Sequence, residues 1–182
     1  MVMGRTQWVV RLPSWLGDTV MAVPTIRALG RSVSRLVLWG PEANCRLLRA
    51  TGVSAEILPY RRRRGAAGLL DMQRAVQALG ALRPSGVVLL PNAYEPALLA
   101  KLARVRRRVG YATQLRSRLL TDPIPAPSPL EPMHESRRFA GLLRATPAGN
   151  PLADDWRLAP PPDAAGRARQ LLGADGPILT VV

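Results

Sequence analysis

The segment from Arg11 to Thr19 reads Arg-Leu-Pro-Ser-Trp-Leu-Gly-Asp-Thr and brings three chemically useful side chains together. Asp18 supplies a carboxylate, Ser14 a hydroxyl, and Trp15 a flat aromatic face that can stack on a sugar. An aspartate at the start of a helix is most often a cap that accepts hydrogen bonds from free amides. The same carboxylate can act as a general base when it faces a cleft. The residues alone leave both interpretations open.

The elements on either side predict where this segment lies. Trp8–Leu12 is an apolar run typical of a buried strand, and Pro13 ends it because proline cannot donate to a sheet ladder. From Asp18 to Leu29 apolar residues recur near helical spacing, with Pro24 either kinking the helix or marking its true first turn. In an open parallel sheet, the passage from strand to helix lies at the carboxyl edge, where ligands bind.

Strand-like and helix-like patterns alternate along most of the chain, which predicts an α/β fold with a Rossmann-like parallel sheet and helices on both faces. The expected strands are Trp8–Leu12, Arg35–Trp39, Glu56–Leu58, Gly86–Leu90 and Arg108–Tyr111. The expected helices between them are Asp18–Leu29, Glu42–Ala50, Leu69–Leu82 and Glu95–Ala103. In the third of these, we expect one inward face made of Leu69, Met72, Val76 and Leu79.

The pattern changes after residue 111. The proline-rich stretch Thr121–Pro129 predicts an extended crossing loop. A helix is expected over His134–Leu143 with Phe139, Leu142 and Leu143 inward, and another over Asp163–Leu172, capped by Asp163 and stopped by Gly173. We therefore expect one domain over residues 1–145, a linker with a short helix over residues 146–175, and the first strand of a second domain over residues 176–182.

Composition narrows the class of protein. The chain has 182 residues, no apolar run of the roughly 18 residues that cross a membrane, and an early apolar stretch that Arg11 interrupts, which predicts a cytoplasmic protein. The single cysteine, Cys45, excludes internal disulfides and is expected to be a small buried apolar residue. The lone histidine, His134, has no Cys or carboxylate cluster near it, so no metal site is expected.

The net charge of +14 is carried almost entirely by arginine. Such an excess attracts anionic partners, whether nucleic acid, lipid headgroups or phosphosugars. The runs Arg61-Arg62-Arg63-Arg64 and Arg106-Arg107-Arg108 are either solvated loop and strand-edge residues or anion-binding sites. No Gly-x-x-x-x-Gly-Lys-Ser/Thr or Gly-x-Gly-x-x-Gly motif is present, which argues against a nucleotide hydrolase or a nicotinamide enzyme.

An ordered set of motifs resembles the ADP-heptose lipopolysaccharide heptosyltransferases, glycosyltransferase family 9, and most of all the branch that adds the second core heptose. The set covers most of residues 8–143. It consists of Pro13-Ser14-Trp15-Leu16-Gly17-Asp18, Leu89-Leu90-Pro91-Asn92 with Ala97-Leu98, Val109-Gly110-Tyr111 with Arg118-Leu119-Leu120-Thr121, and His134-Glu135 with Leu142-Leu143.

The resemblance implies the N-terminal, acceptor-side half of a two-domain GT-B type enzyme. It implies inverting transfer of heptose from ADP-heptose to the lipopolysaccharide inner core, with no metal or other cofactor. It makes Asp18 the catalytic base, and it makes Ser14, Trp15, Gly17, Asn92 and His134 contacts to substrate. Two features depart from the family pattern: Pro96 stands where serine is common, and the donor motif of the Asp-Ser-Gly-x-x-His kind is absent. These residues alone are therefore expected to be inactive.

The resemblance also suggests partners for the arginines. Arg61–Arg64 would meet the anionic lipopolysaccharide core or the inner face of the inner membrane, where the protein would be peripheral.

Simpler interpretations remain beside these. Ser14 and Gly17 also suit a plain tight turn, Trp15 a core or hinge position, Asn92 a turn, and His134 a helix start. Two further classes of function stay open: an arginine-rich module that binds nucleic acid or another polyanion, and a Rossmann-like binding domain without catalysis. The nucleic-acid alternative is weakened by the scarcity of aromatic residues for stacking.

Overall fold

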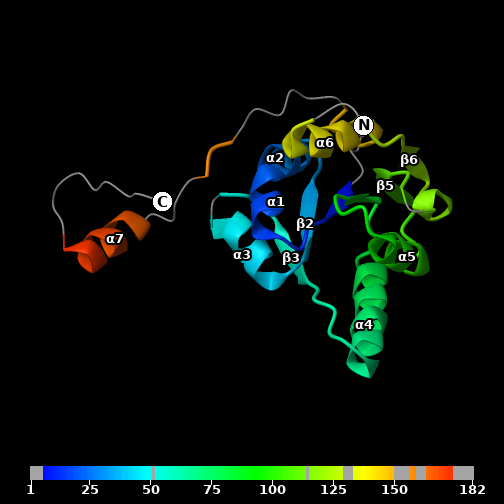
Figure 1. Ribbon diagram of the computed structural model, residues 1–182, viewed down its shortest axis with the longest axis horizontal. Coiled ribbons are helices and arrows are strands. Elements are labelled where there is room, and N and C mark those ends of the chain that lie inside the picture. Colours follow the sequence, from blue (N-terminus) through cyan, green and yellow to red (C-terminus); the bar gives the residue numbers. More distant parts are fainter. Residues whose placement is uncertain are drawn as a thin grey trace.

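The computed structural model describes residues 6–50, 52–113, 115–128, 133–149, 156–158 and 163–173, and it contains a six-stranded parallel sheet (Figure 1). The strand order is β3-β2-β1-β4-β5-β6. The five expected strands are confirmed, with ends shifted by one residue at most. The six strands are β1 (Gln7–Arg11), β2 (Arg35–Gly40), β3 (Glu56–Pro59), β4 (Gly86–Leu89), β5 (Arg107–Tyr111) and β6 (Asp122–Ile124).

Strand β6 corrects the prediction of an extended crossing loop over Thr121–Pro129. Residues Asp122–Ile124 pair in parallel with β5, and Pro123 lies opposite Gly110. Proline is tolerated in this strand because β6 is at the edge of the sheet, where one side of the backbone needs no ladder partner. The clustered prolines made this short edge strand look like a loop in the sequence.

Helices cover both faces of the sheet, as expected (Figure 1). On one face lie α1 (Leu16–Met21), α2 (Val23–Arg31), α3 (Glu42–Ala50) and α6 (Glu135–Gly141) with the 3₁₀ turn η2 (Leu142–Ala145). On the other face lie α4 (Ala66–Leu82), α5 (Tyr94–Leu102) and the 3₁₀ turn η1 (Arg116–Leu119). None of the helices in this part of the chain has the length and apolar character that a membrane-crossing segment needs.

Two apolar layers hold the sheet between these helices. Alternate residues of β1 divide between the layers: Trp8 and Val10 join one, and Val9 joins the other. The first layer also contains Phe139, Leu142 and Leu143, which confirms the expected inward face of that helix.

The helix expected over Asp18–Leu29 is two helices. Helix α1 ends at Met21, Ala22 forms the junction, and α2 begins at Val23 with Pro24 in its first turn. Of the two alternatives for Pro24, the structure therefore shows the second: Pro24 marks the first turn of a helix and does not kink one. A proline fits the first turn of a helix, where its missing N–H has no partner to lose.

Helix α4 corrects the expected inward face. Leu79 is fully buried, whereas Leu69 is 66% exposed. The first turns of α4 extend beyond the body of the domain in Figure 1, so its apolar stripe continues past the surface that covers it. Periodicity identified the face of the helix correctly but could not show where the covering surface ends.

Helix α7 (Ala164–Leu172) follows Asp163, as expected, and Gly173 closes it in the left-handed conformation with φ of 59°. The Asp163 side chain makes no capping hydrogen bond; it accepts one from Arg167 instead. The expected strand over residues 176–182 lies outside the described residues, as does part of the expected loop between residues 146 and 162.

Cys45 is buried in α3, as expected, and its burial raises the pKa of its thiol to about 11. Because the folded protein keeps the thiol proton to a higher pH than the unfolded chain, this group's contribution to stability is complete below pH 9.0. The contribution is lost as the pH rises through about 11. We expect iodoacetamide to leave Cys45 unmodified in the native protein at pH 8 and to modify it fully in denaturant. Equal rates in both states would contradict its burial.

Candidate active site at the carboxyl edge of the sheet

The loops that follow β1, β2, β3 and β4 surround a cleft of about 760 Å³ at the carboxyl edge of the sheet. This edge includes the point between β1 and β4 where the chain reverses its order of strands, which is where ligands bind in such folds. The cleft is lined by Arg11, Ser14, Pro41, Glu42, Ala43, Pro59, Tyr60, Arg61, Arg62, Pro91, Ala93, Glu95 and Pro96. Of the predicted site residues, Ser14, Arg61 and Arg62 line it.

Asp18 does not line this cleft; it lies in the first turn of α1, on the same segment after β1 as Ser14, which does line it. It is the third residue of α1 and half-buried, and the N-cap position belongs to Trp15. No hydrogen bond or ion pair joins the Asp18 carboxylate to another described residue. The capping interpretation is therefore wrong for this position. A carboxylate in the first turn of a helix is favoured by the helix dipole, and no described side chain occupies this one.

The neighbours of Asp18 leave its loop open to solvent. Ser14 and Gly17 are exposed, and the Trp15 side chain is 78% exposed. Exposure to this degree excludes a core position for Trp15. An indole exposed beside a cleft is suited to stacking on a sugar face, although Trp15 does not itself line the cleft.

Asn44, which no sequence pattern singled out, holds this loop in place. Its side-chain nitrogen Nδ2 donates to Thr19 Oγ1 at 2.9 Å, to Pro13 O at 3.2 Å and to Ser14 O at 3.4 Å. Asn44 is buried in α3 and so connects the second strand–helix unit to the loop that carries Asp18.

Replacing Asn44 with leucine is expected to lower the free energy of unfolding by about 1–3 kcal/mol, because buried carbonyl groups lose their donor. Asn44→Asp is the matched variant: it keeps the size but brings acceptor oxygens against the same carbonyls, so it should destabilise at least as much. Urea unfolding at pH 7 measures both. Stability equal to that of the unchanged protein in both variants would show that Asn44 does not hold the loop.

Arg11 is a second functional polar residue that the sequence analysis did not identify, because it lies within an apolar strand. It is 6% exposed, and its Nη1 donates to Leu12 O at 2.8 Å and Trp39 O at 3.3 Å. Its guanidinium lies 5.2 Å from the ring centre of Trp39 and 5.3 Å from that of Tyr60. Burial lowers the pKa of Arg11. This buried cation lines the cleft and forms no ion pair with a described carboxylate.

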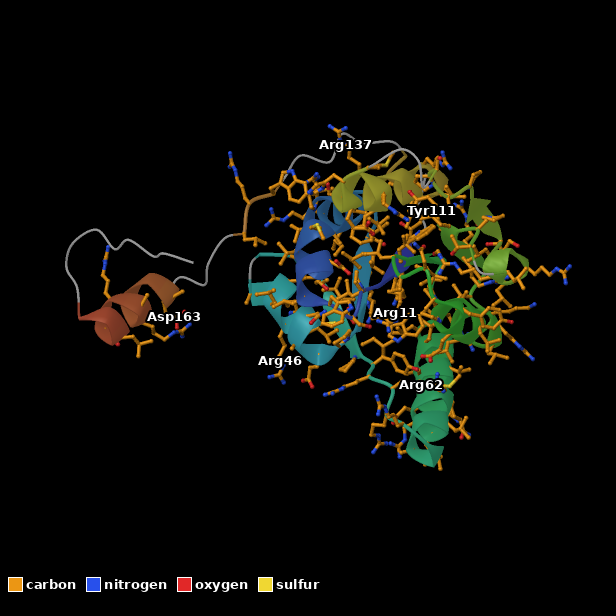
Figure 2. All side chains as sticks on the ribbon, viewed as in Figure 1. Arg11, Arg46, Arg62, Tyr111, Arg137 and Asp163 are labelled. Carbon is orange, nitrogen blue, oxygen red and sulfur yellow. The ribbon has the colours of Figure 1, made fainter. Side chains whose placement is uncertain are left out.

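The lining of the cleft also includes a carboxylate with two donors. Tyr60 donates its hydroxyl to Glu95 Oε1 at 2.5 Å, and Arg62 donates to Glu95 Oε2 at 2.5 Å. Burial, and then the hydrogen bond to Glu95, raise the pKa of Tyr60. Figure 2 shows Arg11 and Arg62 on the same side of the molecule, between α3 and α4. The cations that line the cleft thus come from β1, which carries Arg11, and from the loop after β3, which carries Arg61 and Arg62.

Asn92 is half-buried at the end of β4 and is held by Arg116. The Arg116 guanidinium is fully buried and donates to Tyr111 O at 2.8 Å, Pro91 O at 2.5 Å, Ala93 O at 3.1 Å and Asn92 Oδ1 at 3.3 Å. Burial lowers the pKa of Arg116 to about 10. Arg116 therefore fixes the turn that contains Asn92, whose flanking residues Pro91 and Ala93 line the cleft.

His134 occupies the N-cap position of α6. Its Nδ1 accepts a hydrogen bond from the Ser136 amide at 3.3 Å and lies 2.7 Å from Ser136 Oγ. Its ring also meets Trp156 edge-on, with ring centres 6.2 Å apart. The helix-start role is thus present in the structure. Contact of His134 or Asn92 with substrate stays a prediction.

The four consecutive arginines do not act as one group. Arg61 and Arg62 line the cleft, while Arg63 is bound to Asp71 on α4. Pro96, the departure from the family pattern, also lines the cleft and has no N–H to offer an anion. In the described part of the chain no three His, Cys, Asp or Glu side chains gather in a way that would hold a metal ion.

A scan against protein-family models and a search of curated proteins give no match for this chain. A search of solved structures does. The E. coli ADP-heptose lipopolysaccharide heptosyltransferase II matches with a TM-score of 0.74 and 20% identity, over 94% of this chain and 52% of that one. A family 9 glycosyl transferase from Veillonella parvula matches with a TM-score of 0.70 and 13% identity, over 85% and 44%.

A third structure is the E. coli heptosyltransferase WaaC with ADP-2-deoxy-2-fluoro heptose. It matches with a TM-score of 0.65 and 14% identity, over 83% of this chain and 52% of that one. The chain thus spans about half the length of the solved structures it matches. At these identities the likeness concerns the fold: this domain has the Rossmann-like α/β fold found in the heptosyltransferase and family 9 glycosyltransferase structures.

Proposed function

We propose that this chain is the acceptor-side half of an inverting glycosyltransferase that transfers heptose from ADP-heptose to the inner core of lipopolysaccharide. The observation that carries the proposal is Asp18: a half-buried carboxylate with no described partner, on the segment after β1 that contributes Ser14 to a cation-lined cleft, in a fold shared with heptosyltransferases. On this proposal residues 1–145 form the acceptor-side domain, residues 146–175 the linker, and residues 176–182 the first strand of a donor-binding domain.

The proposed step is a single displacement at the anomeric carbon of the donor sugar. Asp18 takes the proton of the acceptor hydroxyl as its oxygen forms a bond to that carbon from the face opposite the leaving group. The bond from the anomeric carbon to the diphosphate breaks, and its electron pair leaves with ADP. The donor enters as a substrate, and the proposal assigns no resident cofactor or metal to this half.

The remaining residues of the site would bind and orient the acceptor. Arg61 and Arg62 line the cleft and are suited to the negative charges of a core oligosaccharide. Trp15, which is exposed, would stack on a sugar face, while Ser14 and the backbone at Gly17 would contact sugar or phosphate near the start of α1.

The test is a transfer assay on the complete gene product with a heptose-acceptor core oligosaccharide. ADP-heptose is compared with ADP-glucose and UDP-glucose at equal concentrations, and the product is detected by mass. We expect a mass increase of one heptose only with ADP-heptose. Transfer of another sugar at a higher rate would overturn the choice of donor, and no transfer with any donor would overturn the enzyme proposal.

A further inference from the structure

A chain of hydrogen bonds runs from α3 to the turn that carries Asp18. Asn44 Nδ2 donates to Thr19 Oγ1 at 2.9 Å, and Thr19 Oγ1 donates in turn to Trp15 O at 3.0 Å. Both Thr19 and Asn44 are buried, and Thr19 has no exposed surface. Because the Thr19 hydroxyl accepts one bond and donates the other, its single proton is directed toward the Trp15 carbonyl.

These bonds replace the side-chain cap that commonly holds the start of a helix. Trp15 is at the N-cap position of α1, and its side chain makes no capping hydrogen bond. In a capping box, the carboxylate or amide at the third helical position bonds back to the N-cap backbone N–H. Asp18 occupies that third position, but its carboxylate bonds to no described residue. The start of α1 is therefore held from inside the domain, and the carboxylate is left unoccupied.

The direction of the Asp18 side chain consequently depends on the backbone of this turn. Thr19 N donates to Trp15 O at 3.1 Å, and Ala22 N donates to Asp18 O at 3.0 Å. The Trp15 carbonyl thus accepts hydrogen bonds from both the amide and the hydroxyl of Thr19. Since the Asp18 carboxylate has no bond of its own to hold it, loss of the Thr19 hydroxyl would loosen the turn and shift the carboxylate with it.

We propose that Thr19 is a positioning residue for the transfer reaction: its hydroxyl, held by Asn44, fixes the direction in which the Asp18 carboxylate meets the acceptor hydroxyl. The inference rests on the proposed function, because it takes Asp18 as the base. A fully buried side chain such as that of Thr19 cannot touch the substrate itself. Misplacement of a catalytic group by about 1 Å can lower a rate about 10²-fold, so a buried hydroxyl can govern turnover from a distance.

The experiment measures heptose transfer by the complete gene product carrying Thr19→Val, with ADP-heptose and the core oligosaccharide as substrates. Valine is close to threonine in shape but has no hydroxyl. We expect kcat to fall about 10- to 100-fold, while KM for both substrates stays within about threefold, because the residues that line the cleft are unchanged. Thr19→Ser restores the hydroxyl and should return kcat to within about threefold of the unchanged protein.

Thr25 supplies the matched control. It is also a buried threonine, on the neighbouring helix α2, but its Oγ1 has no hydrogen-bond partner among the described residues. Thr25→Val therefore makes the same substitution in an adjacent helix without breaking a hydrogen bond, and we expect kcat within about twofold of the unchanged protein. Circular dichroism and the midpoint of thermal unfolding establish that each variant is folded at the temperature of the assay.

A second measurement separates positioning from a general effect on the fold. Thr19→Val is combined with Asp18→Asn, in which the proton acceptor is already lost. If Thr19 acts through Asp18, the added substitution should lower kcat by less than about twofold in this background. A general structural effect would lower kcat by the same factor in both backgrounds.

Each contrary result has its own meaning. Near-normal kcat in Thr19→Val, with a large loss in Asp18→Asn, would remove the role of Thr19 and leave the proposed function standing. Equal losses in Thr19→Val and Thr19→Ser would assign the effect to packing of the side chain instead of its hydroxyl, and equal factors in both backgrounds would also overturn the inference. Near-normal turnover in Asp18→Asn would overturn the base role and, with it, the positioning role of Thr19.

Discussion

Replacing Asp18 with asparagine is expected to lower kcat for heptose transfer by about 10²- to 10⁴-fold in the complete gene product. Asparagine keeps the shape of the side chain but cannot accept the proton of the acceptor hydroxyl. The acceptor KM should change only a few-fold, because Ser14 and the arginines of the cleft are untouched. Initial rates at varied acceptor concentration separate the two effects.

Glu42 supplies the matched control for Asp18. It is another carboxylate at this edge of the sheet and lines the cleft, but it is bound to Arg46 at 2.6 Å. We expect Glu42→Gln to retain kcat within about threefold, because the loss of an exposed, paired carboxylate alters little. Near-normal turnover in Asp18→Asn would eliminate the base role. A large loss in both variants would indicate that the general negative charge of the cleft matters instead of one proton acceptor.

Most of the sheet was predictable because the strands β1, β2, β4 and β5 are largely buried, whereas the edge strand β3 is only partly so. Such strands appear in the sequence as short continuous apolar runs, and five of them were located to within a residue at each end. β6 escaped because an edge strand can contain proline, and Pro123 made Asp122–Ile124 look like a loop. Leu69 was misplaced for a different reason: helical periodicity gives the apolar face of α4 but not the extent of the surface that covers it.

The site was only partly predictable. Its motif is one short segment of sequence, but the residues that hold that segment in place come from distant parts of the chain. The loop from Ser14 to Asp18 could be placed from the strand and helix around it. The supporting roles of Asn44 and Arg116 could not be predicted. The partners of Asn44 are 25 or more residues away in the sequence, and those of Arg116 are up to 25 residues away. A charged residue is also expected at the surface on general grounds, and Arg11 and Arg116 are both buried. For Arg11, a cation within an apolar strand was the one available signal.

The arginine excess has a more divided role than the net charge indicates. Arg11 and Arg116 are internal, Arg35 pairs with Glu56, and Arg107 pairs with Asp122. Each of these four arginines stabilises the fold, so fewer free positive charges remain for binding nucleic acid. Other cations, among them Arg61, Arg64, Lys101 and Arg106, are exposed and have no ion-paired acidic side chain among the described residues.

The largest expected loss of stability in the sheet comes from the substitution Gly86→Ala. Gly86 lies opposite Trp8 in the register of β1 and β4, and a Cβ at position 86 would lie 2.6–2.8 Å from three atoms of the Trp8 ring. Trp8 is 1% exposed, so its rigid ring has no free space to enter. We expect the free energy of unfolding to fall by about 3 kcal/mol, measured by urea denaturation at 25 °C.

Two further variants show whether the Trp8 ring is the cause. Gly30→Ala is the control: its Cβ would meet only Leu36 Cδ2, at 3.4 Å, and it lies in α2, so stability should be unchanged or rise by up to about 1 kcal/mol. Trp8→Leu, combined with Gly86→Ala, relieves the overlap, so the double variant should lose less than the sum of the two single losses. Strict additivity would mean that the cost of Gly86→Ala arises in the backbone of β4 and not at the indole.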